Sequence, residues 1–372
     1  MNLSACLIVR NGERTLDACL CSIEEHVDEM VVLDTGSTDK SLAIAGRHGA
    51  RLFPFSWTGD FSAARNEALE RATGDWILVI DADETLRPIP REEVRALLSN
   101  SGIIAYHTWL CPKAGWTVMR LMRLFRKHPW VRYRGAIHED IWEGVQKRLA
   151  EGDGKIGQSG IVFDHQGFDG DQQSKHLRNI PLLLQELQRD PDQIWHRQHL
   201  AHCYYETGRK SEAQTLWEEN VRRLRGKGSL SLLDSLSHVA LIQRMLDEGR
   251  DAGGLLKDAL SMFPESPDLA WLQGRERMTR GRFEEAIPCF ERLIRWGQAK
   301  DYDRSIAYEE RIFDAYAYEA LAVRHFRLTM FQEAGRYFEI VRTYIPGSVE
   351  HRLKARFCAV LAEKRSGNPE GH

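Results

Sequence analysis

Two aspartates separated by one residue, Asp81 and Asp83, follow the apolar segment 76–80. Such a segment is typical of a buried strand. Carboxylates at the end of a strand can share one divalent cation, Mg²⁺ or Mn²⁺, because these ions prefer oxygen ligands. A cation held there can stabilise a diphosphate as a leaving group. The same tripeptide is also common in turns that bind no metal, so its surroundings must decide between the two interpretations.

A second predicted strand also ends at an aspartate. Segment 30–33 is apolar and ends at Asp34, and the polar residues 35–39 can cap a helix that begins near Lys40. Further strands are expected over 3–9, 51–55 and 76–80, with helices near 16–23 and over 61–72. Alternating strands and helices predict an α/β fold with a doubly wound, mostly parallel sheet, in which ligands bind beyond the carboxyl ends of the strands. Asp34 and residues 81–84 both lie at such ends.

Helical patterns replace the strand pattern from about residue 175 onward. Glycines 208, 249 and 281 are 41 and 32 residues apart, which brackets the tetratricopeptide period of about 34 residues. Small and aromatic residues recur loosely with them, as at Ala213, Ala259, Ala286 and Ala334. We therefore expect two domains, residues 1–170 and 171–372, the second an all-α array resembling tetratricopeptide repeats. The polar stretch 143–159 between them is expected to be a long loop or hairpin.

Composition excludes several classes of protein. A chain of 372 residues is long for one core and suggests two domains. Lys and Arg number 51 against 54 Asp and Glu, so no global charge attracts nucleic acid. No apolar run approaches the roughly 20 residues of a transmembrane helix, and the run 5–9 is too short for a secretory signal. We expect a cytoplasmic protein whose seven scattered cysteines are reduced.

Several motifs together resemble a known family. Residues 3–11, 32–39 and 74–84 are similar to the N-terminal half of family 2 glycosyltransferases, which have the GT-A fold. The closer resemblance is to the subgroup with C-terminal tetratricopeptide repeats, which includes the peptide S-glycosyltransferases that modify glycosylated bacteriocins. The segments 60–66, 123–126, 138–139 and 165–168 also match this subgroup, except that Phe168 stands where the subgroup often has tyrosine.

The resemblance implies roles for individual residues. Asp34 matches the position that contacts the uridine or ribose of a sugar nucleotide. Asp81 and Asp83 match the Asp-x-Asp pair, in which the second aspartate is usually the direct ligand of Mg²⁺ or Mn²⁺. Arg65 matches an arginine near the nucleotide sugar, and Asn66 accompanies it. For Arg65, a solvated helix face is an equally good interpretation of the sequence alone.

A basic segment precedes the expected catalytic base. Seven Lys and Arg residues and no carboxylate lie between residues 101 and 138. Such a run can hold a diphosphate, but for most of the seven we prefer an exposed strand edge protected by charge. Arg123 is the exception, because it lies in a matching motif and is a donor-binding candidate.

A carboxylate is needed to deprotonate the acceptor in an inverting displacement. Glu139 and Asp140 are both candidates. Glu139 is favoured because it lies in the matched His-Glu pair, whereas Asp140 fits the acidic pair that serves as base in other family 2 enzymes. His138 or His165 can supply a third metal ligand, although an ordinary structural imidazole is at least as good an interpretation for each.

These expectations lead to one leading hypothesis and two alternatives. The leading hypothesis is transfer of a hexose, with inversion, from a nucleotide diphosphate sugar, expected to be UDP-linked, to a peptide or protein held by the concave repeat array. One alternative is a glycosyltransferase of surface polysaccharide or lipid-linked glycan synthesis. The other is a non-catalytic repeat scaffold. Repeat arrays also mediate dimerisation, which leaves a homodimer open.

Overall fold

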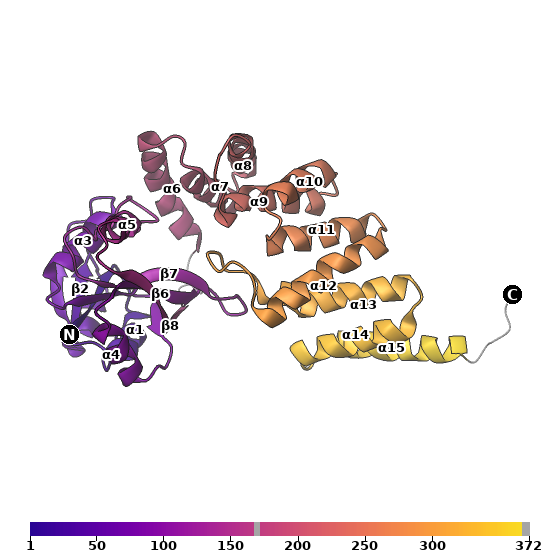
Figure 1. Cartoon of the computed structure of the whole chain (residues 1–372), viewed down its shortest axis with the longest axis horizontal. Helices are drawn as coiled ribbons and strands as arrows, with labels where there is room; N and C mark the ends of the chain where they lie inside the picture. Colours follow the sequence, from indigo (N-terminus) through magenta and orange to yellow (C-terminus); the bar gives the residue numbers. More distant parts are fainter. Residues whose placement is uncertain (167–171, 367–372) are drawn as a thin grey trace. The chain divides into compact units, whose positions relative to one another are not determined.

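The computed structural model describes residues 1–166 and 172–366, which form two compact units (Figure 1). Unit 1 consists of residues 1–114 and 118–216, and unit 2 of residues 115–117 together with the chain from 217 onward. The predicted domain boundary near residue 170 lies outside the described residues. The first two helices that follow it group with the sheet of unit 1.

Unit 1 is built on one mixed sheet. Within the described residues the sheet has eight strands in the order β3-β2-β1-β4-β7-β6-β8-β5. Their bounds are β1 Leu3–Val9, β2 Glu29–Asp34, β3 Arg51–Pro54, β4 Trp76–Val79, β5 Glu84–Leu86, β6 Ile103–Cys111, β7 Met119–Arg126 and β8 Lys155–His165. Strands β1 to β4 are mutually parallel, whereas β7 runs antiparallel to β4 and β6. The predicted α/β class is confirmed.

Helices cover both faces of this sheet, as expected for a doubly wound fold. They are α1 Leu16–Ile23, α2 Ser41–Arg47, α3 Phe61–Arg71, α4 Arg91–Ser99, α5 Trp142–Ala150, α6 Gln172–Arg189 and α7 Ile194–Glu206. Leu3, Ala5 and Leu7 of β1 share one core with α1, α2 and α4. Cys6 of the same strand lies in a second core with α3 and α5. Successive residues of a strand face opposite sides, so a largely apolar strand can serve both cores.

Two sequence predictions about the polar segments are wrong. Residues 143–159 are not a loop, because they contain most of α5 and the start of β8. Gly144 belongs to α5, where an added Cβ would lie 2.1 Å from the backbone oxygen of Trp130. The glycine therefore allows close packing rather than breaking the helix. Strand β7, which carries Arg120, Arg123 and Arg126, lies between β4 and β6 and is not a sheet edge.

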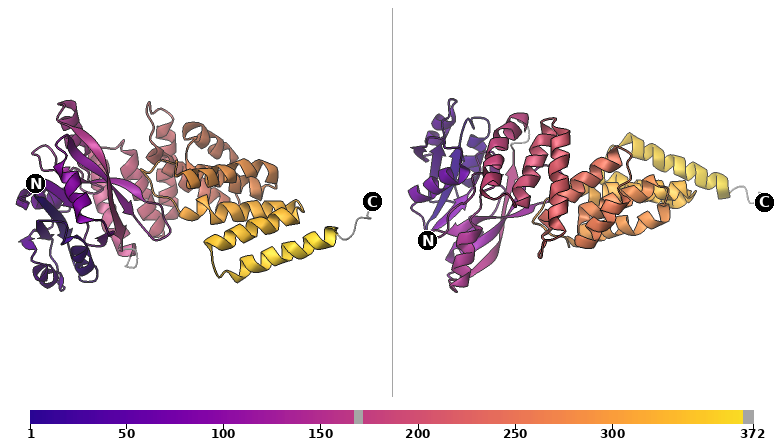
Figure 2. Two further views of the ribbon diagram at one scale, coloured as in Figure 1. Left: turned by 60° about the horizontal axis from the view of Figure 1, so that its bottom comes forward. Right: turned by 90° about the horizontal axis from the view of Figure 1, so that it is seen from above.

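The second unit is helical, as predicted. Its elements are the end of α8 Lys210–Leu224, η2 Leu232–Ser235, α9 Leu236–Asp247, α10 Gly253–Met262, α11 Pro267–Thr279, α12 Phe283–Ala299, η3 Glu310–Phe313, α13 Ala315–Arg327, α14 Phe331–Tyr344 and α15 Val349–Ser366. Helices α11 and α12, α13 and α14, and α14 and α15 pack side by side (Figure 2). None of the helices in the described ranges is long and apolar enough to cross a membrane.

One type of turn recurs between the paired helices. Gly208, Gly249 and Gly281 have positive φ angles of 85°, 68° and 73°. In each turn the glycine N–H bonds to the carbonyl three residues earlier. Thr329 occupies the equivalent position after α13, with a φ of 57° and the same hydrogen bond. This fourth turn has no glycine, so the glycine spacing in the sequence does not reveal it.

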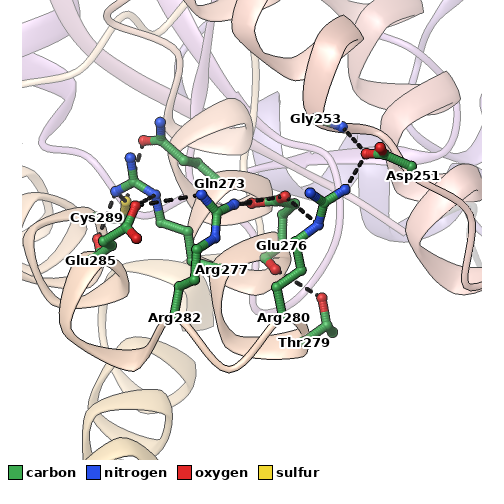
Figure 3. Close-up of polar contacts among 10 residues, drawn as sticks. All are labelled: Asp251, Gly253, Gln273, Glu276, Arg277, Thr279, Arg280, Arg282, Glu285 and Cys289. Atoms are coloured by element: carbon green, nitrogen blue, oxygen red, sulfur yellow. Dashed lines mark hydrogen bonds and ion pairs between the residues drawn. The ribbon is translucent and has the colours of Figure 1, made fainter.

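An ion network around the buried carboxylate of Glu276 holds α11 to its neighbours (Figure 3). The carboxylate of Glu276, on α11, is 4% exposed and lies 2.8 Å from Nε of Arg280 and 2.6 Å from Nη2 of Arg282. Arg280 also pairs with Asp251 before α10, and Asp251 accepts a hydrogen bond from the N–H of Gly253. The network therefore links the beginning of α10 to the end of α11.

Backbone hydrogen bonds bring residues 115–117 into unit 2. The N–H of Thr117 donates to the carbonyl of Tyr308 at 2.8 Å, and the N–H of Glu310 donates to the carbonyl of Gly115 at 2.9 Å. Trp116, between them, forms an isolated antiparallel β-bridge with Glu309.

Candidate active site

The Asp-x-Asp segment forms a closed turn between β4 and β5. The N–H of Glu84 donates to the carbonyl of Asp81, and the N–H of Asp81 donates to Oε2 of Glu84, each at 3.0 Å. The side chain of Glu84 is only 1% exposed. The turn therefore holds the side chains of Asp81 and Asp83 at the carboxyl end of β4, where the strand pattern places them.

Two arginines hold the Asp81 carboxylate. Nη2 of Arg65 lies 2.7 Å from Oδ1, and Nη2 of Arg123 lies 3.0 Å from Oδ2. Arg123 also pairs with Glu84. Burial favours a neutral Asp81, but the two guanidinium groups outweigh it and hold the pKa of this carboxyl well below its usual range. Burial raises the pKa of Glu84, against the opposing effect of Arg123.

Arg65 also joins Asp81 to the favoured base. Its Nε pairs with Oε1 of Glu139, whose side chain is 10% exposed. The guanidinium lies over the ring of Tyr133, 5.4 Å from its centre. Arg65 comes from α3, whose first turn is capped by Asp60 through a 3.0 Å bond from the N–H of Ala63. Helix α3 thus presents Arg65 to two carboxylates from separate parts of the chain.

The loop that carries Glu139 is anchored on both sides. Ser62 Oγ donates to the carbonyl of Gly135 at 2.6 Å, and the N–H of Phe61 donates to the carbonyl of Ala136 at 2.9 Å. On the other side, the N–H of Ala136 donates to Oε1 of Glu186 on α6 at 2.9 Å. His138 then turns the chain with a φ of 54°, a left-handed conformation that costs a non-glycine residue about 1 kcal/mol.

Asp83 lies in different surroundings from Asp81. Its Oδ2 is 3.3 Å from Nε2 of His165 and 3.4 Å from Nζ of Lys175. The N–H of Gln166 donates to the Asp83 carbonyl at 2.7 Å, which fixes the end of β8 beside the turn. Burial alone would raise the pKa of Asp83, but the hydrogen bond and charge of His165, assisted by Lys175, give a net lowering.

Of the two histidines predicted as metal ligands, the structure brings His165 to Asp83. His138 instead faces α7, where its ring centre is 3.7 Å from that of His199 and 6.0 Å from that of Trp195. Burial lowers the pKa of His138 to about 4. The rest of the matched segment that begins at His165, residues 167 and 168, lies outside the described residues.

Three other predicted residues, Asp34, Asn66 and Asp140, hydrogen-bond to backbone groups. Asp34 accepts hydrogen bonds from the N–H groups of Gly36 and Ser37, at 3.1 to 3.2 Å, and closes the loop after β2. The Asn66 amide pairs with the backbone N–H and carbonyl of Tyr133 at 2.8 and 2.9 Å. Asp140 is exposed and accepts from the N–H of Trp142 at 2.7 Å, before α5. The donor-binding and base roles of these three residues stay predictions.

Sequence reasoning missed two participants in the cluster. Glu84 was part of the acidic strand end but received no role, although its position beside Asp83 was a usable signal. Lys175 gave no signal, because it is 92 residues from Asp83 in the chain. Only the packing of α6 brings the two together.

The residues around Asp83 fit a divalent cation that is held jointly with a substrate. Oδ2 of Asp83 and Nε2 of His165 lie 3.3 Å apart, close enough to coordinate the same cation. In the described parts of the chain, no group of three or more His, Cys, Asp or Glu residues is arranged to hold a metal ion by itself. Mg²⁺ is commonly bound through one or two carboxylates plus substrate phosphates, which agrees with so small a set of protein ligands.

Residues 4–145 match the model of the family described as glycosyl transferase family 2. The N-terminal part of this chain is therefore similar to family 2 glycosyltransferases. The match ends after Glu139 and Asp140, so it includes Arg65, Asp81, Asp83 and the predicted base.

Curated relatives resemble the glycosyltransferase domain. The chain is 45% identical over 139 residues to a TPR repeat-containing protein of Synechococcus elongatus, an alignment that covers 37% of this chain and 34% of the relative. It is 29% identical over 140 residues to the SPbeta prophage-derived glycosyltransferase SunS of Bacillus subtilis, covering 36% and 33%. The alignments thus span about a third of each relative. They confirm the predicted resemblance to family 2 glycosyltransferases and to proteins with tetratricopeptide repeats.

Two solved structures are more distant. Staphylococcus aureus TarS in complex with UDP is 15% identical, with a TM-score of 0.39 over 74% of this chain and 88% of that one. Glucosyl-3-phosphoglycerate synthase of Mycobacterium tuberculosis, in complex with Mn²⁺, UDP and glucosyl-3-phosphoglycerate, is 19% identical, with a TM-score of 0.37 over 50% and 79%. Likeness at this level assigns neither a substrate nor a metal to this chain.

Proposed function

We propose that the chain is an inverting glycosyltransferase that moves a hexose from a nucleoside diphosphate sugar, UDP-linked, to a peptide or protein side chain. One observation carries the proposal: Arg65 joins Glu139 to the Asp-x-Asp turn at the carboxyl end of β4. This is the edge at which an α/β sheet binds its ligand. The family 2 match covers the same residues and supports a glycosyl transfer.

The proposed reaction needs one base and one stabilised leaving group. The acceptor hydroxyl or thiol gives its proton to the Glu139 carboxylate, and the acceptor atom forms a bond to the anomeric carbon. The bond between that carbon and the diphosphate oxygen breaks, and the nucleoside diphosphate leaves with the electron pair. Arg65 fixes the direction of Glu139 through its Nε contact, which supports a base aimed at one position.

Asp83 and His165 are the residues that would hold a divalent cation. When bound, Mg²⁺ or Mn²⁺ would neutralise charge that develops on the departing diphosphate. Asp81 has a different task in this proposal. Its carboxylate keeps the guanidinium groups of Arg65 and Arg123 in fixed positions beside the turn.

The helical unit supports a peptide or protein as the acceptor. Its repeated helix pairs are of the type whose stacking forms extended binding surfaces. In this proposal the catalytic domain supplies donor binding and chemistry, and the repeats supply acceptor binding.

Replacing Glu139 by Gln tests the assignment of the base. We expect E139Q to lower the rate of transfer by about 10²- to 10⁴-fold, the usual contribution of a general base, while the affinity for the sugar nucleotide changes little. The measurement is transfer from a panel of sugar nucleotides with Mn²⁺ to peptide and to saccharide acceptors. D140N is the matched control, because Asp140 is exposed and caps the backbone before α5.

The outcomes of this assay separate the hypotheses. Loss of transfer in D140N but not in E139Q would move the base to Asp140. Transfer to saccharides or lipid-linked glycans, with none to peptides, would contradict the proposed acceptor class. A folded wild-type protein that turns over no sugar nucleotide would contradict the enzymatic proposal itself.

A further inference from the structure

One face of α6 packs along the elements that build the site. Its residues recur every three or four positions, the spacing of a single helical face, and are Lys175, Arg178, Leu182 and Glu186. Glu186 holds the N–H of Ala136 in the Glu139 loop. Leu182 lies beside Gly59, where an added Cβ would be 3.8 Å from its Cδ2. The Arg178 guanidinium is 5.4 Å from the ring centre of Phe61.

Lys175 is the first of these four residues and lies beside the Asp-x-Asp turn. Nζ of Lys175 is 3.4 Å from Oδ2 of Asp83, the same oxygen that His165 approaches. The Lys175 side chain is 36% exposed and has a long flexible stem, so its ammonium can move without a change in the helix. The guanidinium of Arg178, one turn further along, donates to Oδ1 of Asn179 at 3.2 Å.

An ammonium and a divalent cation compete for one carboxylate, because both are positive and repel each other at short range. Lys175 therefore weakens the attraction of Asp83 for a cation as long as it remains paired with Asp83. A diphosphate removes this conflict. Its oxygens offer the ammonium a strongly charged alternative acceptor next to the same site.

We propose that Lys175 is an exchangeable counter-ion: it pairs with Asp83 in the donor-free protein and with the diphosphate in the donor complex. Helix α6 thereby supplies a cationic side chain to the donor site. The inference rests on the proposed function and deepens it, because it makes cation binding at Asp83 depend on the diphosphate. It also assigns a binding role to a residue outside the family 2 match, which ends at residue 145.

Binding measurements on the full-length chain test the exchange without any turnover. The probes are Mn²⁺ alone, followed by electron paramagnetic resonance, and inorganic pyrophosphate in excess EDTA, followed by calorimetry. We expect K175Q to bind Mn²⁺ about tenfold more tightly than wild type and metal-free pyrophosphate about tenfold more weakly, the size of one charge-assisted hydrogen bond. K175R should stay close to wild type in both measurements.

The matched control is K147Q. It removes the same charge from unit 1, at a lysine whose ammonium lies 4.0 Å from the ring centre of Trp130, and should change neither affinity. Circular dichroism confirms that each variant is folded. The inference is overturned if K175Q binds Mn²⁺ no more tightly than wild type, if it binds pyrophosphate equally well, or if wild type binds no pyrophosphate. Failure of the proposed function is a different result: both shifts appear, but no sugar nucleotide supports transfer.

Discussion

Asp81 and Asp83 stand two positions apart in the chain but lie in opposite electrostatic surroundings. Asp81 is held by two guanidinium groups that are 11% and 14% exposed, whereas Asp83 meets an imidazole and an ammonium that are 21% and 36% exposed. Removing Asp81 leaves two enclosed cations without their shared anion. Removing Asp83 leaves groups that water can reach. The two substitutions should therefore have different effects on stability.

We expect Asp81→Ala to lower the free energy of unfolding by about 3 kcal/mol, the typical cost of breaking an enclosed ion pair from one side. Asp83→Ala should lower it by less than about 1 kcal/mol but abolish metal-dependent turnover of the donor. Urea unfolding and a donor-turnover assay with Mn²⁺ measure the two effects. Equal stability losses would show that Arg65 and Arg123 do not depend on Asp81, and full turnover in Asp83→Ala would refute the metal assignment.

His138 makes the folded chain sensitive to acid. Burial lowers its pKa from the ordinary value of 6.5 to about 4, with the charge of His196 adding to the effect. Between these two values the unfolded chain binds a proton that the folded chain does not. Neutral His138 therefore makes its full contribution to the free energy of unfolding above pH 6.5. This contribution decreases as the pH drops toward 4, by up to roughly 3 kcal/mol.

Replacing His138 by Asn should flatten this loss. Asn cannot titrate in this range, and it tolerates the φ of 54° at this position. We expect urea unfolding of H138N to show a smaller loss of stability between pH 6.5 and 4 than wild type. A residual slope should remain, because burial also lowers the pKa of His199 on α7. Identical pH profiles for the two proteins would contradict the assignment to His138.

At the level of elements, close packing between paired helices restricts which side chains fit at their contact. Gly274 lies in α11 against the ring of Phe290 in α12, where an added Cβ would be 2.5 Å from Cε1. Phe290 is only 1% exposed and is packed within the core of unit 2, so its ring cannot move away. The glycine is therefore a contact point between two helices rather than a helix end.

We expect Gly274→Ala to destabilise unit 2 by about 1–3 kcal/mol, as overpacking does, although alanine favours helix by about 1 kcal/mol. Gly254→Ala in α10 is the matched control. An added Cβ there meets nothing within 4 Å, so this variant should gain up to about 1 kcal/mol. Thermal unfolding followed by circular dichroism measures both, and a stabilised Gly274→Ala would mean that the helix pair can separate without cost.

At the level of the whole molecule, α6 and α7 belong to unit 1, which carries the candidate active site. Glu186 of α6 holds the loop of Glu139, and His199 of α7 packs on His138. A fragment of residues 1–209, cut at the turn after α7, retains these contacts. A fragment of residues 1–175 loses nearly all of α6 and the whole of α7.

We expect the 1–209 fragment to unfold cooperatively and to hydrolyse the donor slowly, but to use the acceptor poorly. The 1–175 fragment should lack a cooperative transition, because the Glu139 loop loses its support. Thermal unfolding and donor-hydrolysis assays compare the two fragments. A stable, active 1–175 fragment would show that α6 is not part of the site, and full acceptor use by 1–209 would contradict the proposed role of the repeats.

The sequence by itself determined what depends on local patterns. Apolar runs and capping residues located β1 to β4 and the helices between them, since the side chains that form such elements lie close together in the chain. The position of Asp81 and Asp83 at the end of β4 follows from the same pattern. The turn at Thr329 was missed because threonine rarely adopts a positive φ. The helix around Gly144 was missed because glycine usually weakens a helix.

Only the tertiary structure decided how the acidic residues divide their tasks. Arg65, Arg123, Glu139 and Lys175 come from α3, β7, a loop and α6, and no periodicity in the chain encodes their meeting. Charges interact through space, so the partner of each carboxylate is set by how helices pack on the sheet. That packing gives Asp81 two arginines, gives Asp83 a histidine and a lysine, and turns His138 toward α7.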